Sequence, residues 1–214
     1  FMRADIPYKV VGGTRFYERK EVKDMLAYLA AVVNEDDDVA TRRVINTPRR
    51  GIGDTAVEAV ERFQREHNSG AARTGGALMS FGQALRHAGE LGLQARSAKA
   101  VAEFVDLMDD LRSLARDNGP AGVLDAIADR SGMVRQMRAS DDPQDASRIE
   151  NVMELVAVGR EFSEDNPEGT LADFLEKVAL VADADQIPDA DGSGGVVTLM
   201  TLHTAKGLEF PVVF

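Results

Sequence analysis

Two short stretches of the sequence combine residue types and spacings that could do chemistry, and the first lies between Thr201 and Phe210. An apolar, β-branched run leads there into a loop that carries Thr, His, Thr, Lys and Glu. Ligands of open α/β sheets bind at the carboxyl ends of the strands. Lys206, beside Gly207, could contact a phosphate, and Glu209 could accept hydrogen bonds from a ribose hydroxyl. The spacing alone fits equally well with a polar surface turn whose Lys and Glu are solvated.

The second stretch is a basic, glycine-rich turn that contains Arg49, Arg50, Gly51, Ile52 and Gly53. Two glycines let the backbone approach a phosphate closely. We expect a helix to begin at about Thr55, so that its free N–H groups and its positive dipole end face the same place. A helix–hairpin–helix of this kind grips the backbone of a duplex without reading its bases. The alternative interpretation is a tight turn with solvated arginines.

The charge distribution favours one oriented contact with a polyanion. The net charge of −11 argues by itself against nucleic-acid binding, because phosphate contacts need Lys and Arg. Residues 41–53, however, contain four arginines and no acid, whereas the carboxylates gather in residues 35–38, 164–168 and 183–191. An acidic chain with one basic patch therefore suggests a single contact surface and not a protein that coats nucleic acid.

Composition excludes several other classes of protein. Cysteine is absent, which rules out disulfides and thiolate metal sites and indicates a reducing cytoplasm. No apolar run approaches the ~18 residues that a membrane-spanning helix needs. The sequence also has no G-x-x-x-x-G-K-[ST] phosphate loop and no paired acids to hold Mg²⁺, although phosphoryl transfer requires both.

The elements that must position these residues are mostly helices. Apolar residues spaced by three and four predict helices near residues 22–33, 39–46, 55–66, 78–88, 95–116, 122–129, 146–162 and 170–178. Capping boxes are predicted at Thr55 with Glu58 and at Thr170 with Asp173. The residues expected to face inward include Val22, Met25, Leu26, Leu29 and Val33 in the first helix and Ile149, Val152, Met153 and Val156 in a later one.

The segments between and around these helices complete the predicted order of elements. Residues 67–76 are expected to form a mobile loop, and the Asp- and Gly-rich residues 183–195 a linker. Short strands are predicted at residues 8–11, 196–202 and 210–214. A helical domain inserted into an α/β domain would give this order.

Three segments carry long motifs in a fixed order. Residues 201–210 match T-x-H-x-x-K-G-L-E-F at every specified position. Residues 12–24 are similar to G-G-x-x-F-[FY]-x-R-x-E-[IV]-K-D, and residues 46–54 to N-x-P-x-R-G-I-G, while residues 148–151 are a weaker local match. These are motif V and two flanking segments of superfamily 1A DNA helicases of the UvrD, PcrA and Rep type, and the chain resembles the bacterial UvrD and PcrA members most.

The resemblance implies a mainly α fold. A helical insert, the 2B domain, would contain the helix–hairpin–helix-like Gly-Ile-Gly turn and would be flanked by short α/β remnants of the RecA-like domain 2A. Residues 1–33 would be a remnant of domain 2A with a linker helix, residues 34–190 the 2B insert, and residues 191–214 the return into domain 2A with motif V. Both ends of the chain are interpreted as cut.

The resemblance also implies roles for individual residues. Glu209, Gly207 and Lys206 would contact the nucleotide, with Glu209 holding its ribose. Single-stranded DNA would be met by Thr201, His203, Thr204 and Arg15. An orienting role is the alternative for His203, and a structural salt bridge the alternative for Arg15. The duplex would be gripped by Arg49, Arg50, Gly51, Ile52, Gly53 and Thr55.

The implied function is part of an ATP-dependent 3′-to-5′ DNA helicase and translocase of DNA repair, in a bacterial cytoplasm. The parent protein would use ATP and Mg²⁺, whereas this chain would contain no catalytic residue, hold no metal or cofactor and be inactive alone. Its partners would be a duplex–single-strand DNA junction, the rest of the motor and DNA-repair proteins, and not a membrane. The alternative is a non-catalytic, autoinhibitory module that binds a repair protein.

Overall fold

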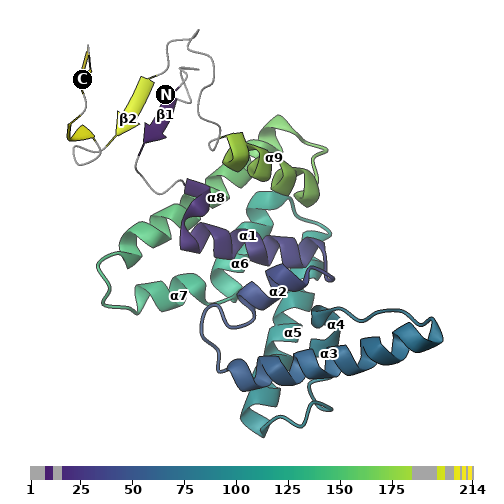
Figure 1. Cartoon of the computed structure of the whole chain (residues 1–214). Helices are drawn as coiled ribbons and strands as arrows, with labels where there is room; N and C mark the ends of the chain where they lie inside the picture. Colours follow the sequence, from purple (N-terminus) through teal and green to yellow (C-terminus); the bar gives the residue numbers. More distant parts are fainter. Residues whose placement is uncertain are drawn as a thin grey trace. The chain divides into compact units, whose positions relative to one another are not determined.

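A computed structural model describes residues 8–11, 16–184, 197–200, 205–207, 209–210 and 212–213 of the chain (Figure 1). The chain divides into two compact units. One combines Phe1–Arg19 with Lys177–Phe214, and the other is the continuous stretch Lys20–Glu176. None of the described helices is both long enough and apolar enough to cross a membrane.

The first unit contains two paired strands. β1 (Tyr8–Val11) and β2 (Val197–Met200) run parallel, with Tyr8 opposite Val197 and Val11 opposite Met200. Parallel neighbours need a crossover connection, and here the crossover includes the whole second unit. The strand predicted at residues 8–11 is confirmed, and the one predicted at 196–202 is confirmed over its centre. A 3₁₀ turn (Phe16–Glu18) follows β1 along the chain.

Helices make up nearly all of the remaining described structure, so the predicted mainly α fold is confirmed. They are α1 (Lys20–Val33), α2 (Asp38–Val44), α3 (Asp54–Thr74), α4 (Phe81–Leu85), α5 (Ala95–Ala115), α6 (Pro120–Arg130), α7 (Met133–Arg138), α8 (Asp145–Asp165) and α9 (Leu171–Ala184). The long predicted helix 95–116 matches α5 within one residue. The short helix α7 was not predicted.

Helix α1 is the centre of the helical unit and contacts α2, α5, α6 and α8. Val22, Met25 and Leu29 are fully buried, as their spacing predicts. Tyr28 is also fully buried, whereas Val33, expected to face inward, is 40% exposed. Val33 is the last residue of the helix, and its neighbours Ala31 and Val32 are buried in its place, so the buried face continues to the last turn but excludes Val33.

Helix α3 corrects two predictions. Residues 67–74, expected to be a loop, continue the helix, which ends at Gly75 in the left-handed conformation with φ of 72°. The helix begins at Asp54 behind an extended Gly53, and no side chain caps it, so the predicted Thr55–Glu58 capping box is wrong. Thr55 instead lies inside the first turn.

A tertiary contact explains why the polar end of α3 is helical. The Asn68 side chain accepts a hydrogen bond from the Met79 amide (2.7 Å) and donates one to the Met79 carbonyl (3.0 Å). Gln64 donates to the same carbonyl (3.2 Å). These contacts hold the segment after α3 against the helix, although Asn and Ser are poor helix formers by themselves.

Capping and burial elsewhere give mixed results. The predicted Thr170–Asp173 pair is confirmed, since the two residues exchange hydrogen bonds of 2.7–3.2 Å before α9. The box that starts α4 is formed instead by Ser80 and Gln83. Met153, expected to be buried, is 47% exposed on α8, because the buried face of that helix follows Val152, Leu155 and Val156. That face is set by the neighbouring α6 and α1.

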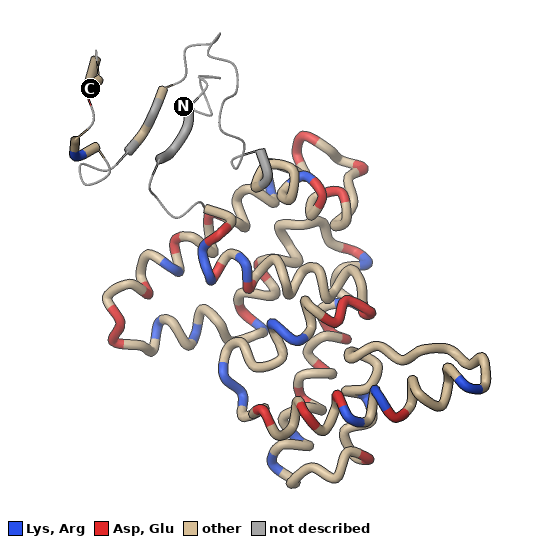
Figure 2. The backbone as a smooth tube through the Cα atoms, in the orientation of Figure 1, with Lys and Arg blue, Asp and Glu red and all other residues tan. Residues whose placement is uncertain are grey.

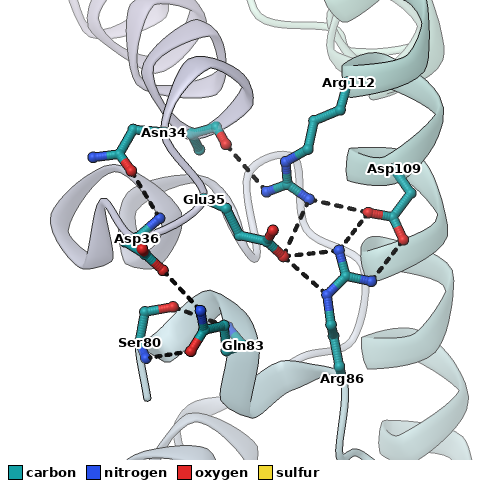
Figure 3. Close-up of polar contacts among 9 residues, drawn as sticks. Asn34, Glu35, Asp36, Ser80, Gln83, Arg86, Asp109 and Arg112 are labelled. Atoms are coloured by element: carbon teal, nitrogen blue, oxygen red, sulfur yellow. Dashed lines mark hydrogen bonds and ion pairs between the residues drawn. The ribbon is translucent and has the colours of Figure 1, made fainter. Parts of the chain in front are cut away.

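A charged cluster fastens the α1–α2 connection to α4 and α5 (Figure 3). Arg86 donates two hydrogen bonds to Asp109 (2.6 and 2.7 Å) and one to Glu35 (2.9 Å). Arg112 donates to Asp109 (3.1 Å) and to the Ala31 carbonyl (3.1 Å). The acidic stretch around Glu35 is therefore held by both Arg86 and Arg112.

The Arg86–Asp109 pair makes stability depend on pH. The Arg86 guanidinium holds the pKa of the Asp109 carboxyl below its usual value of 3.8. A folded-state pKa below the unfolded one means that this stabilisation is complete above pH 3.8 and is lost as the pH falls through the folded pKa. We expect Asp109→Asn to lower the free energy of unfolding by about 1 kcal/mol at neutral pH, because the pair is half-exposed and screened by solvent.

Urea denaturation between pH 7 and pH 2 measures this difference. The gap between Asp109→Asn and the parent chain should close in acid. The neighbouring Asp110, which is exposed and makes no ion pair within the described part of the chain, provides the matched Asp110→Asn control. A gap that stays constant down to pH 2 would contradict the prediction.

Candidate nucleic-acid interface

The basic turn between α2 and α3 presents alternate residues to opposite sides. Ile52 is buried, with 1% of its surface exposed, whereas Gly51 and Gly53 are exposed. Gly51 has φ of +87°, a conformation that favours glycine, and nothing lies within 4 Å of a side-chain position at either glycine. The buried Ile52 side chain anchors the turn, so of that residue only the backbone could meet a ligand.

The two arginines of this turn are placed differently. Arg49 is exposed and makes no ion pair or side-chain hydrogen bond within the described residues. Arg50 instead donates from Nη2 to the Thr47 carbonyl (2.9 Å) and to the Tyr28 hydroxyl. Its guanidinium carbon lies 5.2 Å from the centre of the Phe104 ring. The sequence predicts the same duplex contact for both arginines, but of the two only Arg49 is available as a free cation.

The other two arginines of the basic segment are also engaged. Arg42 forms ion pairs with Glu61 (3.1 Å) and Asp38 (3.3 Å) and stacks on Phe81 at 4.5 Å. Arg43 pairs with the buried Asp24 at 2.8 Å. Carboxylates therefore balance Arg42 and Arg43 in the folded chain, whereas Arg49 and Arg50 keep their positive charge and only Arg49 presents it on the surface without a partner among the described residues.

The start of α3 adds unpaired donors beside Gly51 and Gly53. Because no side chain caps this helix, the amides of Asp54 and Thr55 remain available, whereas the Ala56 amide donates to the Gly53 carbonyl (2.9 Å). The positive end of the helix dipole points the same way. Thr55 is exposed in this first turn. The carboxylate of Asp54 sits there as well and opposes an anion, so the backbone and Arg49 must supply the attraction. Figure 2 shows basic residues on this connection, within a chain whose acids lie on most other segments.

Arg49 also borders a groove of about 560 Å³. The groove lies between the start of α1, the turn, α7 and the start of α8, and three buried carboxylates line it. Each has a partner: Asp24 pairs with Lys20 (2.7 Å) and Arg43, Glu21 accepts from Asn151 (2.5 Å), and Asp145 pairs with Arg148 (2.6 Å). Asp24 and Asp145 are balanced by basic partners, whereas Glu21 has a neutral partner, so the groove keeps acidic character and Arg49 is the cation at its edge that has no partner in the described part of the chain.

The predicted nucleotide contacts lie in the other unit. Lys206, Gly207 and Glu209 are all exposed, and Gly207 has φ of +86° with open space around it. An accessible lysine, an unobstructed backbone and an accessible carboxylate have the chemistry to meet a phosphate and a ribose. The predicted single-strand contacts Thr201, His203, Thr204 and Arg15 lie outside the described residues. Within the described part of the chain, no group of three or more His, Asp or Glu could hold a metal ion.

Sequence reasoning missed Tyr28 and Asn46. Tyr28 is hidden within the apolar stripe of α1, and nothing local indicates that its hydroxyl reaches the turn. The Asn46 side chain accepts a hydrogen bond from the Arg50 amide (2.9 Å). Its signal was present, since Asn46 is the first residue of the N-x-P-x-R-G-I-G match.

Comparison with known proteins places the chain among helicases. The model of the UvrD-like helicase C-terminal domain matches residues 1–70 and 88–214, so that the end of α3 and all of α4 fall outside the match. The chain is 49% identical over 230 residues to the ATP-dependent DNA helicase UvrD1 of Mycobacterium tuberculosis, and 37% identical over 216 residues to the ATP-dependent DNA helicase PcrA of Bacillus subtilis. In both comparisons all of this chain is covered, and it spans 28% of the relative's length. The chain belongs to the UvrD-like helicase C-terminal domain family.

Proposed function

We propose that this chain is the part of an ATP-dependent DNA helicase that holds duplex DNA next to the motor. The observation that carries the proposal is the turn at residues 49–53: two open glycines, an uncapped helix start and one free arginine share a surface. This arrangement binds a phosphate backbone without contacting bases, as a helicase that acts on any sequence requires. The proposed contacts with the duplex are Arg49, Gly51, Gly53 and Thr55 in the first turn of α3. The buried Ile52 side chain anchors the turn, and Arg50 bonds to Thr47 and Tyr28 on its inner side.

The domain assignment is part of the same proposal. Residues 34–190 correspond to the 2B insert, and residues 1–33 and 191–214 to strips of the RecA-like domain 2A. The compact division at residues 20 and 176 supports an inserted helical unit, although it puts α1 with the insert. Both relatives named above are ATP-dependent DNA helicases, which supports a parent with that activity.

In this proposal, ATP is bound by the complete parent protein and not by this chain alone. Lys206, Gly207 and Glu209 meet one side of ATP, and Thr201, His203, Thr204 and Arg15 meet single-stranded DNA. The phosphate loop and the Mg²⁺ ligands come from outside this sequence, which contains neither motif. The chain alone therefore neither hydrolyses ATP nor unwinds DNA. A 3′-to-5′ direction, a role in DNA repair and a bacterial cytoplasmic setting complete the proposal.

Fluorescence anisotropy with a duplex–single-strand junction tests the duplex contact. We expect Arg49→Ala to weaken binding about fivefold at low salt and to reduce the slope of log affinity against log salt by about 1, because one phosphate contact is lost. Arg160→Ala is the matched control, since Arg160 is exposed on α8 and has no ion pair within the described residues. Equal losses for both variants would mean that the effect is only one of total charge. No binding by the parent chain would refute the duplex contact.

A protein-binding, autoinhibitory module is the second candidate. The net charge of −11 favours it, since a chain with more acids than bases is repelled by DNA but not by a basic protein surface. A stable complex with a repair protein, combined with no measurable binding to the DNA junction, would support this function over the first.

A further inference from the structure

Arg50 reaches three parts of the helical unit from the back of the turn. Its Nη2 donates to the Thr47 carbonyl and to the Tyr28 hydroxyl on α1, and its guanidinium faces the Phe104 ring on α5. Its backbone amide donates to the Asn46 side chain (2.9 Å). The Arg50 Nε atom is buried. One side chain thus connects the turn to two helices that are distant in sequence.

Tyr28 also contacts the Thr47 carbonyl, which Arg50 binds. Its hydroxyl contacts the Thr47 carbonyl and lies 3.3 Å from the Val44 carbonyl at the end of α2. The ring is fully buried, and burial raises the pKa of the Tyr28 hydroxyl to about 12. Like any tyrosine hydroxyl, it is protonated at neutral pH and can donate a hydrogen bond. The Thr47 carbonyl therefore receives hydrogen bonds from both Arg50 and Tyr28 and is held facing inward.

We propose that Arg50 and Tyr28 are positioning residues that hold the 46–53 turn with Arg49, Gly51 and Gly53 facing outward, and that Arg50 does not itself contact DNA. The effect on DNA binding rests on the function proposed above, whereas the effect on the turn does not. With the Thr47 carbonyl fixed inward, the Arg49 side chain points outward and the Ile52 side chain packs into the core, and the exposed Gly51 and Gly53 backbone lies on either side of Ile52.

The side-chain chemistry separates this role from a phosphate contact. A phosphate contact depends mainly on positive charge, which lysine keeps. The Arg50 role depends on a planar guanidinium that lies on an aromatic ring while it donates to two acceptors, and a lysine ammonium on a flexible stem does not reproduce this geometry. The conservative change Arg50→Lys is therefore informative, as is Tyr28→Phe, which removes one oxygen and no charge.

The first measurement is anisotropy with the DNA junction across a salt series. We expect Arg49→Lys to bind within twofold of the parent chain. Arg50→Lys and Tyr28→Phe should each bind about three- to tenfold more weakly, the range that corresponds to a lost hydrogen bond, with an unchanged salt slope because no charge is removed. Phe174→Leu, a change of a fully buried ring that packs on Phe162, controls for general loss of stability and should bind as the parent does.

The second measurement, hydrogen exchange without DNA, tests the turn by itself. The amides at positions 47 and 50 are hydrogen-bonded to the Val44 carbonyl and the Asn46 side chain. They should exchange at least about tenfold faster in Arg50→Lys and Tyr28→Phe, and as in the parent chain in Arg49→Ala and Phe174→Leu. Faster exchange in a chain that binds no DNA would refute the proposed function and leave the positioning role intact. Parent-like exchange and binding in Arg50→Lys would overturn the positioning role.

Discussion

Replacement of Phe104 by alanine should lower the free energy of unfolding by about 3–5 kcal/mol, the usual loss when a fully buried aromatic ring is removed. Only 1% of the Phe104 surface is exposed, and its ring lies beneath the Arg50 guanidinium. It also borders a small cavity with Leu85 and Met108, so the space left behind would be lined by atoms that cannot all move in to fill it. Both lost burial and an unfilled cavity contribute.

Urea denaturation followed by circular dichroism suits this measurement, because the chain is mostly helical and has no tryptophan. Phe210→Ala is the matched control, since Phe210 is 41% exposed, and we expect a change below about 1 kcal/mol there. Similar losses for the two variants would show that Phe104 is not part of a packed core. The packing of Phe104, on α5, against Arg50 of the turn would then be contradicted.

Gly159→Ala should destabilise the chain by about 1–3 kcal/mol, although alanine is the better helix former. Gly159 lies in α8 where α8 packs against α6. An added Cβ would be 3.1 Å from the Ala121 amide nitrogen, 3.1 Å from Leu124 Cδ1 and 3.3 Å from the Ala121 Cα. Two of these three atoms belong to the backbone, so the helices must separate to admit the methyl group. This steric penalty exceeds the gain in helix propensity.

Gly70→Ala is the control, for which we expect a change in the free energy of unfolding of the opposite sign. Gly70 lies within α3, and nothing is within 4 Å of the position of an added Cβ. The substitution should therefore stabilise the chain by about 0.5–1 kcal/mol through helix propensity alone. Thermal or urea unfolding of the two variants and the parent chain measures both the expected loss and the expected gain of stability. Stabilisation by Gly159→Ala would mean that α6 and α8 are not in close contact.

Local sequence patterns were sufficient where an element depends on its own residues. The period of apolar side chains located α5 within one residue, and the Thr170–Asp173 pair marked the start of α9. Patterns failed where a partner distant in sequence decides the outcome. The Asn- and Ser-rich end of α3 is helical because Asn68 and Gln64 bind the Met79 carbonyl, and no window of neighbouring residues contains that contact.

The sequence alone determined the family, the mainly helical fold and the position of the Gly51–Gly53 turn, because glycine spacing, arginines and apolar periodicity are properties of neighbouring residues. Tertiary structure alone decided which cation of that turn is free. Arg49 and Arg50 are adjacent and chemically identical in the sequence, yet one is exposed and the other bonds to Tyr28 and Thr47. The direction of a side chain depends on the partners that folding brings near it, and Tyr28 and Phe104 reach Arg50 only once α1 and α5 have packed together.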